Sequence, residues 1–312
     1  MRKAAWLARF PSWRRRSRIS LPVIQLIVGA TMISFSAVWV KLTVVGPDTA
    51  AFYRVALGGG ILLVISLARR DRLWPGARAV AMIVAAAVFF ALDLLLWHRS
   101  IHYVGPGIAT LIPNFQVFVL AVAGLLFLGE RWRWQLAVAA PAAIVGLFLL
   151  VGSDWGAMPQ GYHLGIWMGL LTMVCYAGYV LSLRASRVRG PGSFSSFASI
   201  ALVSLVTAAL LAVVIVADGH ESFAIPGWRD GGILLAYGLC AQVAGWVLIS
   251  KSLVRLPTSQ VGLILLLQPV LAFAWDVLFF HGNFDAIQIV GAVIALAAIY
   301  LGQQRGKAAG IG

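Results

Sequence analysis

Long apolar stretches alternate along the chain with short breaks that carry charges, glycine or proline. Each stretch is close to the roughly 20 residues that an α-helix needs to cross the hydrocarbon core of a bilayer. Breaks such as residues 46–48 and 69–72 have the composition of turns. The pattern predicts an all-α polytopic membrane protein with ten transmembrane helices, over residues 22–44, 49–68, 79–98, 104–128, 134–152, 162–183, 194–217, 231–250, 257–280 and 286–302.

An internal repeat relates the fourth predicted helix to the ninth. At an offset of 152 positions, Ser100 matches Ser252 and Gln116 matches Gln268, and a weaker repeat at an offset of 140 relates the starts of the two halves. Ten helices in two similar halves give five per half, and because five is odd the second half must cross the membrane in the opposite sense. Inverted repeats are typical of secondary transporters, whose substrate site lies near the membrane midplane between the repeats.

The repeat and the breaks together predict how the chain is divided. A basic N-terminal tail precedes the first five-helix repeat, an outer linker separates the two repeats, and a short tail follows the second. These segments are expected at residues 1–21 (N-terminal tail), 22–152 (first repeat), 153–161 (linker), 162–302 (second repeat) and 303–312 (C-terminal tail).

The composition excludes a soluble domain. Hydrophobic residues make up 61% of the chain and charged residues 11%, and the mean hydropathy is +0.93. The apolar stretches are too long and too free of charge for a soluble core. Both cysteines, Cys175 and Cys240, fall inside apolar stretches, which predicts buried thiols and neither a disulfide framework nor a metal site.

The basic residues predict the orientation of the helices. If the N-terminus is inside, 20 of the 24 lysines and arginines fall in inner segments and only three at outer helix ends. This bias predicts that both termini are cytoplasmic. The net charge of +14 is spread over six inner segments, whereas a nucleic-acid-binding face would gather it, so we expect no nucleic-acid partner.

Several short motifs resemble those of one transporter family. They are Phe52-Tyr53-Arg54, Phe127-Leu128-Gly129-Glu130-Arg131, Gln268-Pro269, and the glycine-bearing helices that close each half, at Gly146 and Gly291. Over residues 22–302 the chain thereby resembles the drug/metabolite transporter superfamily, in its ten-helix EamA-type group. The resemblance implies a basket of ten helices around a central cavity, alternating access, and export of amino acids or other small metabolites, as in bacterial exporters of the YddG type. It also implies that the protein lies in a bacterial inner membrane. The sequence departs from the family pattern at Pro113, which lies one turn before the family's proline position at Val117.

Three ionisable residues inside the predicted helices are candidates for coupling or for an ion pair: Arg54, Asp93 and Asp276. Each such charge costs on the order of a few kcal/mol in a membrane and usually faces a cavity or a partner. In the functional interpretation, Asp93 and Arg54 meet near the outer mouth and contact a zwitterion or a proton. In the structural alternative, Arg54 reaches the outer interface and Asp93 makes only a structural pair.

Aromatic and amide side chains are the candidates for the cavity wall. An aromatic-lined cavity suits hydrophobic or aromatic amino acids and organic cations, whereas the alternative is that these aromatics face lipid. Asn114 and Gln116 are two positions apart, so only one of them is expected to see the cavity. The predicted substrate cavity comprises Trp39, Asp93, Trp97, Gln116, Tyr176, Tyr179, Gln242, Trp246, Gln268 and Trp275.

Absent motifs narrow the function classes. The chain has no phosphate-binding loop, so we expect no nucleotide site, no cofactor and no ATP-binding subunit, with transport driven by a gradient. The histidines are expected at the outer interface, and no metal site is predicted although His98 and His102 are four positions apart. The expected partners are a small-molecule substrate and the lipid bilayer. Two alternatives stay open: a drug or organic-cation exporter of the same fold, and a polytopic membrane enzyme acting on lipid-like substrates.

Overall fold

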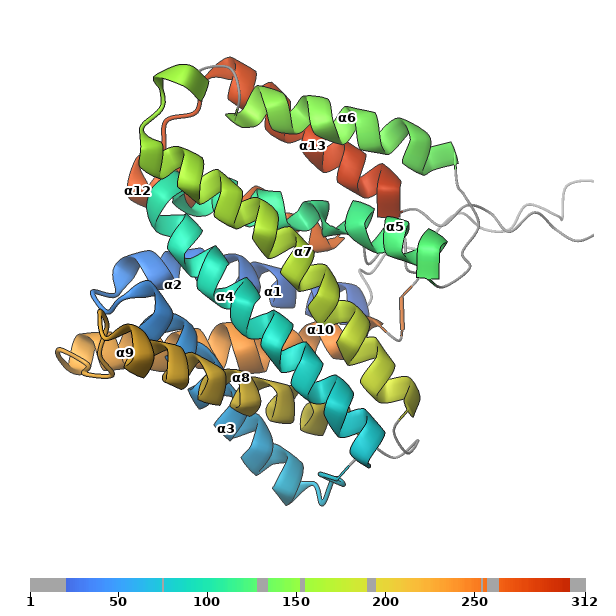
Figure 1. The fold of residues 1–312 in the computed structure, drawn as a ribbon, viewed down its shortest axis with the longest axis vertical. Helices are drawn as coiled ribbons and strands as arrows, with labels where there is room; N and C mark the ends of the chain where they lie inside the picture. The colour runs from blue at the N-terminus through green and yellow to red at the C-terminus, as the bar shows by residue number, and fades with distance from the viewer. Residues whose placement is uncertain are drawn as a thin grey trace, which may run out of the picture.

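The computed structural model describes residues 21–74, 76–127, 134–151, 155–189, 195–253, 255–256 and 264–303. All regular structure in these ranges is helical (Figure 1). The basic tail predicted at 1–21 lies almost wholly outside the described residues, as does the Glu130-Arg131 turn. The elements are α1 (Leu21–Ser34), α2 (Ser36–Leu42), α3 (Pro47–Ala68), α4 (Ala77–Leu111), η1 (Ile112–Phe115), α5 (Gln116–Phe127), α6 (Trp134–Val151), η2 (Trp155–Ala157), α7 (Gln160–Arg189), α8 (Ser196–Asp218), α9 (Trp228–Tyr237), η3 (Gly238–Gly245), α10 (Trp246–Leu253), α12 (Leu267–Phe280) and α13 (Ala286–Gln303).

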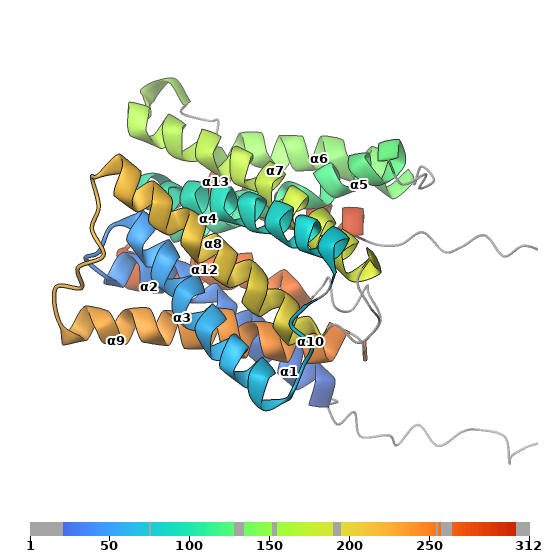
Figure 2. The same cartoon turned by 60° about the horizontal axis from the view of Figure 1, so that its bottom comes forward.

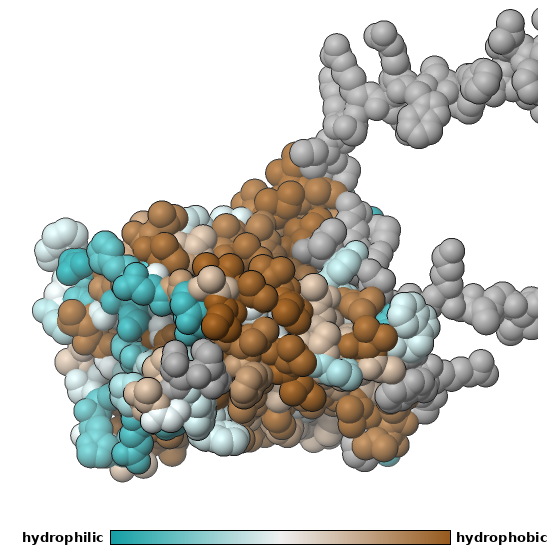
Figure 3. Space-filling model, turned by 90° about the horizontal axis from the view of Figure 1, so that it is seen from above, coloured by the Kyte–Doolittle hydropathy of each residue, from teal (hydrophilic) through white to brown (hydrophobic). Residues whose placement is uncertain are grey.

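The helices are long and apolar enough to cross a membrane. Seven helical stretches of the described chain meet both criteria, and α12 and α13 are shorter apolar helices. One of the seven, Ala77–Leu126, is 50 residues long and folds back on itself at Gly105, so it makes two passes. Figure 3 shows apolar side chains forming a belt across one face, with polar side chains gathered at one end. The prediction of an all-α polytopic membrane protein is confirmed.

The turn between the third and fourth passes lies at Gly105. Its φ of 79° and ψ of 164° interrupt the helix, and Pro106 follows. We expected the break beside Arg99, and this boundary was wrong, because the helix continues for another turn and a half. Arg99 needs no break, since its guanidinium pairs with the carboxylate of Asp48 on α3. Glycine is required at 105 because few other residues adopt a positive φ and because an added Cβ would lie 2.7 Å from the Oδ2 atom of Asp276.

Helices of the first half pack against helices of the second in a symmetric pattern. α3 packs on α8, α6 on α13, and the segment after the Gly105 turn on α12 (Figures 1 and 2). In addition, α4 packs on α7, while η3 and α10, which hold the place of α4 in the second half, pack on α1. This exchange of partners is the arrangement that two repeats related by a two-fold axis in the membrane plane produce.

Glycines allow the last helix of each half to make close contact. A Cβ added to Gly146 on α6 would lie 2.6 Å from the backbone nitrogen of Ala295 on α13. A Cβ added to Gly291 on α13 would lie 2.5 Å from the backbone nitrogen of Leu150. Small residues of this kind are what let membrane helices approach closely, since no hydrophobic effect drives helices together in lipid.

The bundle has two ends, which we name after one residue at each. The Gly46 end comprises residues 43–46, 219–227 and 281–285, and the Asp71 end comprises residues 69–74, 195 and 255–256. Which end faces the cytoplasm stays a prediction from the basic residues.

Candidate functional site

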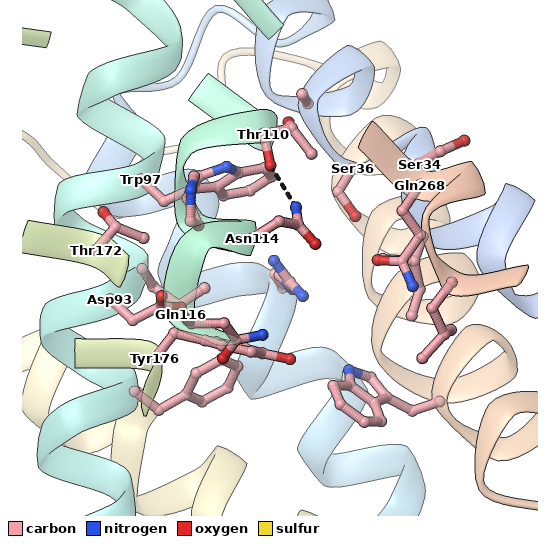
Figure 4. Close-up of a pocket in the computed structure, with 18 of the residues that line it drawn as sticks. Ser34, Ser36, Asp93, Trp97, Thr110, Asn114, Gln116, Thr172, Tyr176 and Gln268 are labelled. Carbon is pink, nitrogen blue, oxygen red and sulfur yellow. Dashed lines mark hydrogen bonds between the residues drawn. The ribbon is translucent and has the colours of Figure 1, made fainter. Parts of the chain in front are cut away.

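A cavity of about 210 Å³ lies between the two halves, bounded by α1, α2, α3, α4, η1, α5, α7, α10 and α12. Its wall contains charged, polar, aromatic and aliphatic side chains. In Figure 4, Asp93, Gln116 and Tyr176 lie together on one side, while Ser34 and Gln268 lie on the other. No described lining residue comes from the loops of the Gly46 end, whereas Ile249 and Leu265 extend the wall toward the Asp71 end. The polar lining residues are Ser34, Ser36, Arg54, Asp93, Thr110, Asn114, Gln116, Thr172 and Gln268, and the aromatic ones are Phe90, Trp97, Tyr176 and Trp246.

Asp93 contributes a carboxylate to this wall. It lies on α4, is 6% exposed, and lines the cavity together with Trp97, one turn further on the same helix face. The structure gives Asp93 no ion-pair partner among the described residues. A carboxylate so deeply placed is costly unless a ligand or a proton compensates it.

Arg54 contributes a guanidinium from α3. Its Nε donates to the Oε1 atom of Gln242 at 3.3 Å, and its Nη1 donates to the Tyr237 hydroxyl at 3.1 Å. The guanidinium carbon lies 5.9 Å from the centre of the Trp97 ring and 5.3 Å from that of Tyr237, within the range of cation–π attraction. Arg54 is buried at 7% exposure, so the alternative in which it reaches the outer interface is wrong. The predicted ion pair with Asp93 does not form either: the two groups share the cavity without an ion pair.

The amides of the fourth pass both line the cavity. We expected only one of Asn114 and Gln116 to do so, and this was wrong. Residues Ile112–Phe115 form a 3₁₀ turn around Pro113, and the tighter winding brings the two side chains closer in angle than an α-helix does. Asn114 is fixed by its Nδ2, which donates to the carbonyl oxygen of Thr110 at 2.7 Å (Figure 4).

With this geometry in view, comparison with known proteins identifies the family. The sequence profile of the EamA-like transporter family matches residues 20–152 and 163–302. The chain belongs to this family. The EamA-type prediction is confirmed, and the protein is a multi-pass membrane transporter of small metabolites.

Individual proteins resemble this EamA-type chain over most of its length. The threonine/homoserine exporter RhtA of Escherichia coli (strain K12) is 26% identical over 300 residues, covering 91% of this chain and 92% of RhtA. Protein RarD of Streptomyces exfoliatus is 25% identical over 227 residues, covering 73% of this chain and 68% of RarD. One crystal structure has a sequence 17% identical to this chain. The two superpose over 90% of this chain and 95% of the other with a TM-score of 0.61, which shows the same fold. The likeness to YddG-type exporters stays a prediction.

Six of the ten residues predicted for the cavity of this EamA-type transporter line it: Asp93, Trp97, Gln116, Tyr176, Trp246 and Gln268. Four lie outside the described lining. Two of these four contact wall residues from behind. Gln242 bonds Arg54, and the Nε1 of Trp275 donates to the Ser34 hydroxyl at 2.9 Å.

The other two pack into apolar clusters. Tyr179 stacks on Phe90 with ring centres 4.6 Å apart, and Trp39 packs against the cluster that contains Ile108 and Leu111. Small hydroxyl residues of the wall, such as Ser36 and Thr172, were missed. Serine and threonine occur throughout these helices, so no sequence signal marked these two.

Asp276 has a different role from the one expected. It does not belong to the described cavity lining. Its Oδ2 atom accepts a hydrogen bond from the backbone N–H of Gly107 at 2.9 Å, at the Gly46 end of the bundle. Asp276 therefore connects the two halves through the main chain.

His98 also departs from expectation. It was predicted at the interface, yet it is fully buried, with Nδ1 2.7 Å from the carbonyl oxygen of Leu94 and Nε2 3.1 Å from the Tyr237 hydroxyl. Across the described residues, no group of three or more His, Cys, Asp or Glu side chains is placed to hold a metal ion.

Proposed function

We propose that this EamA-type transporter is a secondary exporter of amino acids, and that it binds them as zwitterions between Arg54 and Asp93. One observation carries the proposal: a buried guanidinium and a buried carboxylate face the same cavity without pairing with each other. A ligand with one carboxylate and one ammonium satisfies both charges at once. Hydrogen bonds to charged groups contribute about 1.5–3 kcal/mol each, enough to select such a ligand.

The rest of the wall suits an amino-acid side chain. Hydroxyl and amide groups of Thr110, Asn114 and Gln268 can bond a polar side chain, and Tyr176 and Trp246 can pack on an apolar one. The RhtA relatives are named threonine/homoserine exporters and align over nearly the whole chain. L-threonine is therefore the first substrate to test.

The direction of transport follows from the predicted orientation. With both termini cytoplasmic, the Asp71 end is the cytoplasmic end, and the cavity wall extends toward it. Substrate then enters from the cytoplasm, and alternating access releases it at the Gly46 end. Since the chain has no phosphate-binding loop, a gradient of the substrate or of an ion supplies the energy.

A second candidate is an exporter of organic cations. Asp93 lies in a wall that also holds Phe90, Trp97 and Tyr176, and aromatic faces around a carboxylate attract quaternary ammonium groups. In this case Arg54 would repel the cargo or play only a structural part.

Counterflow in proteoliposomes separates these candidates. Labelled L-threonine should accumulate in liposomes preloaded with threonine, and Arg54→Gln and Asp93→Asn should each raise the half-saturating concentration about tenfold or more, since each loses a charged hydrogen bond. The matched controls Arg229→Gln and Asp285→Asn, both at exposed positions, should behave as wild type. Uptake of tetramethylammonium that depends on Asp93 and not on Arg54, with no threonine counterflow, would instead favour the cation exporter.

A further inference from the structure

In the part of the chain that the structure describes, Arg54 is held by uncharged groups only, and one edge of its guanidinium has no hydrogen-bond partner. The described residues supply hydrogen-bond partners for Nε and Nη1, namely Gln242 and Tyr237, and supply none for Nη2. A buried guanidinium usually pairs with a carboxylate, because an uncompensated buried charge is costly. The free edge, made of Nη2 and the second N–H of Nη1, has the two parallel donors that bind a carboxylate in bidentate fashion.

A chain of hydrogen bonds behind Arg54 has a fixed direction. The Leu94 carbonyl can only accept, so the His98 Nδ1 beside it carries a proton and donates. In a neutral ring the His98 Nε2 then accepts the Tyr237 hydroxyl proton. The Tyr237 oxygen is thereby turned to accept from Arg54 Nη1. Each member of the chain has one arrangement that satisfies all its partners, so the position of the guanidinium is specified.

Gln242 fixes the other side of the guanidinium. Because the Arg54 Nε can only donate, the Gln242 Oε1 must face it and accept. The Gln242 Nε2 is then turned toward α8, where it donates to the Ser204 hydroxyl at 2.9 Å. Gln242 lies in the π-helical segment η3, a wide turn that is often found at functional sites. It approaches α3 at Gly58, one turn after Arg54, where an added Cβ would lie 2.5 Å from the Gln242 Cβ.

We infer that His98, Tyr237 and Gln242 are positioning residues that orient Arg54 to clamp the carboxylate of the cargo. The inference rests on the proposed function. None of the three belongs to the described lining of the cavity, and each is at most 1% exposed, so they act through Arg54 and not on the cargo. A preorganised guanidinium loses less conformational freedom on binding, and its fixed edge distinguishes a planar carboxylate from a neutral ester or amide.

The test compares acids with their methyl esters. Dissociation constants of purified protein are obtained from ligand-dependent shifts in melting temperature, for L-threonine, L-serine, L-leucine and L-phenylalanine and for the methyl ester of each. The wild type is expected to bind at least one acid about tenfold or more tighter than its ester, because the ester loses the charged hydrogen bonds. Tyr237→Phe and His98→Leu should bring this ratio close to one, and His98→Gln, which keeps an acceptor, should retain part of it.

Matched controls separate positioning from stability. Tyr53→Phe removes a tyrosine hydrogen bond to the Phe223 carbonyl at the Gly46 end, and His163→Leu removes a histidine contact with the Trp155 carbonyl. Both should leave the acid-to-ester ratio unchanged. A purely structural role of Tyr237 and His98 would lower the melting temperature while leaving their ratio at the wild-type value, and this would overturn the inference while the proposed function stands. A wild type with no preference for any acid over its ester would overturn both.

Discussion

The Oδ2 atom of Asp276 accepts a hydrogen bond from the backbone N–H of Gly107, 2.9 Å away and 169 positions earlier in the chain. Within the described ranges, it is one of three carboxylates of the second half that bind backbone N–H groups of the first half at the Gly46 end. Glu221 accepts from the N–H groups of Asp48 and Thr49, and Asp230 from that of Val44. These bonds join the halves at the Gly46 end, none of whose described loop residues lines the cavity. We expect them to break when this end opens.

Removing the Asp276 carboxylate should loosen this end. In Asp276→Ala the Gly107 N–H loses its partner, which costs about 1–3 kcal/mol when it stays buried. We expect a lower melting temperature and faster labelling of a cysteine introduced by Thr110→Cys when an impermeant thiol reagent is added at the Gly46 end. Cys175 and Cys240 are first replaced by serine so that only the introduced thiol reacts.

Asp285→Ala is the control for this experiment. Asp285 also bonds a backbone N–H, that of Gln288, but within its own half at the exposed start of α13. Its loss should lower stability without changing the labelling rate. Equal labelling rates for Asp276→Ala and the parent would show that the carboxylate does not hold this end closed.

Asp93 is the one carboxylic acid in the described cavity lining. If transport is coupled to protons through the cavity, Asp93→Asn should abolish the response of threonine flux to an imposed pH gradient while exchange at saturating threonine continues. Fluxes into proteoliposomes with and without the gradient measure this. A wild type that ignores the gradient would identify facilitated diffusion, and a response that survives in Asp93→Asn would remove Asp93 from the coupling step.

The contact between α6 and α13 should not tolerate a methyl group. Gly291→Ala places a Cβ 2.5 Å from the backbone nitrogen of Leu150, and such overpacking costs roughly 1–3 kcal/mol. We expect a clearly lower melting temperature in detergent. Gly232→Ala is the matched control on α9, because nothing lies within 4 Å of the added Cβ. Replacing a helical glycine there should raise stability by up to about 1 kcal/mol, and a melting temperature equally unchanged in both variants would contradict the close contact.

The predicted orientation can be tested by labelling from outside the cell. In the variant lacking Cys175 and Cys240, single cysteines within residues 154–161 and 220–228 should react with an impermeant reagent. Cysteines within residues 186–191 should react only after the membrane is permeabilised. These expectations follow from the 20 basic residues of the inner segments. The reverse pattern would invert the orientation and, with it, the proposed direction of transport.

The sequence alone determined the class of the fold and the approximate course of the helices. The thickness of the bilayer sets the length of an apolar stretch directly, so helices such as α3 and α13 were predicted to within a few residues. The break after Arg99 was misplaced because a charge was taken for a helix end. The decisive feature was the backbone of Gly105, which has a positive φ and precedes a proline.

Tertiary structure decided which side chains reach the cavity. Tyr176 and Tyr179 share one helix face, yet only Tyr176 belongs to the described lining, because Phe90 of α4 covers Tyr179. Periodicity gives the direction of a side chain from its own helix axis and does not say what the neighbouring helix places in front of it. Periodicity also failed at Asn114 and Gln116, where an α-helix predicts that only one side chain reaches the cavity. A 3₁₀ turn brings both of them to it.

The hydrogen-bond partners of Arg54 could not be predicted from the sequence for the same reason. The sequence singled out Arg54 as a charge inside a predicted helix, but the groups that hold it come from 183 and 188 positions away, at Tyr237 and Gln242. They meet because α3 packs against the π-helical segment η3 at Gly58. The length of an apolar stretch is a local property that can be counted directly in the sequence. The partners of a buried charge depend on how distant helices pack, and only the assembled bundle specifies them.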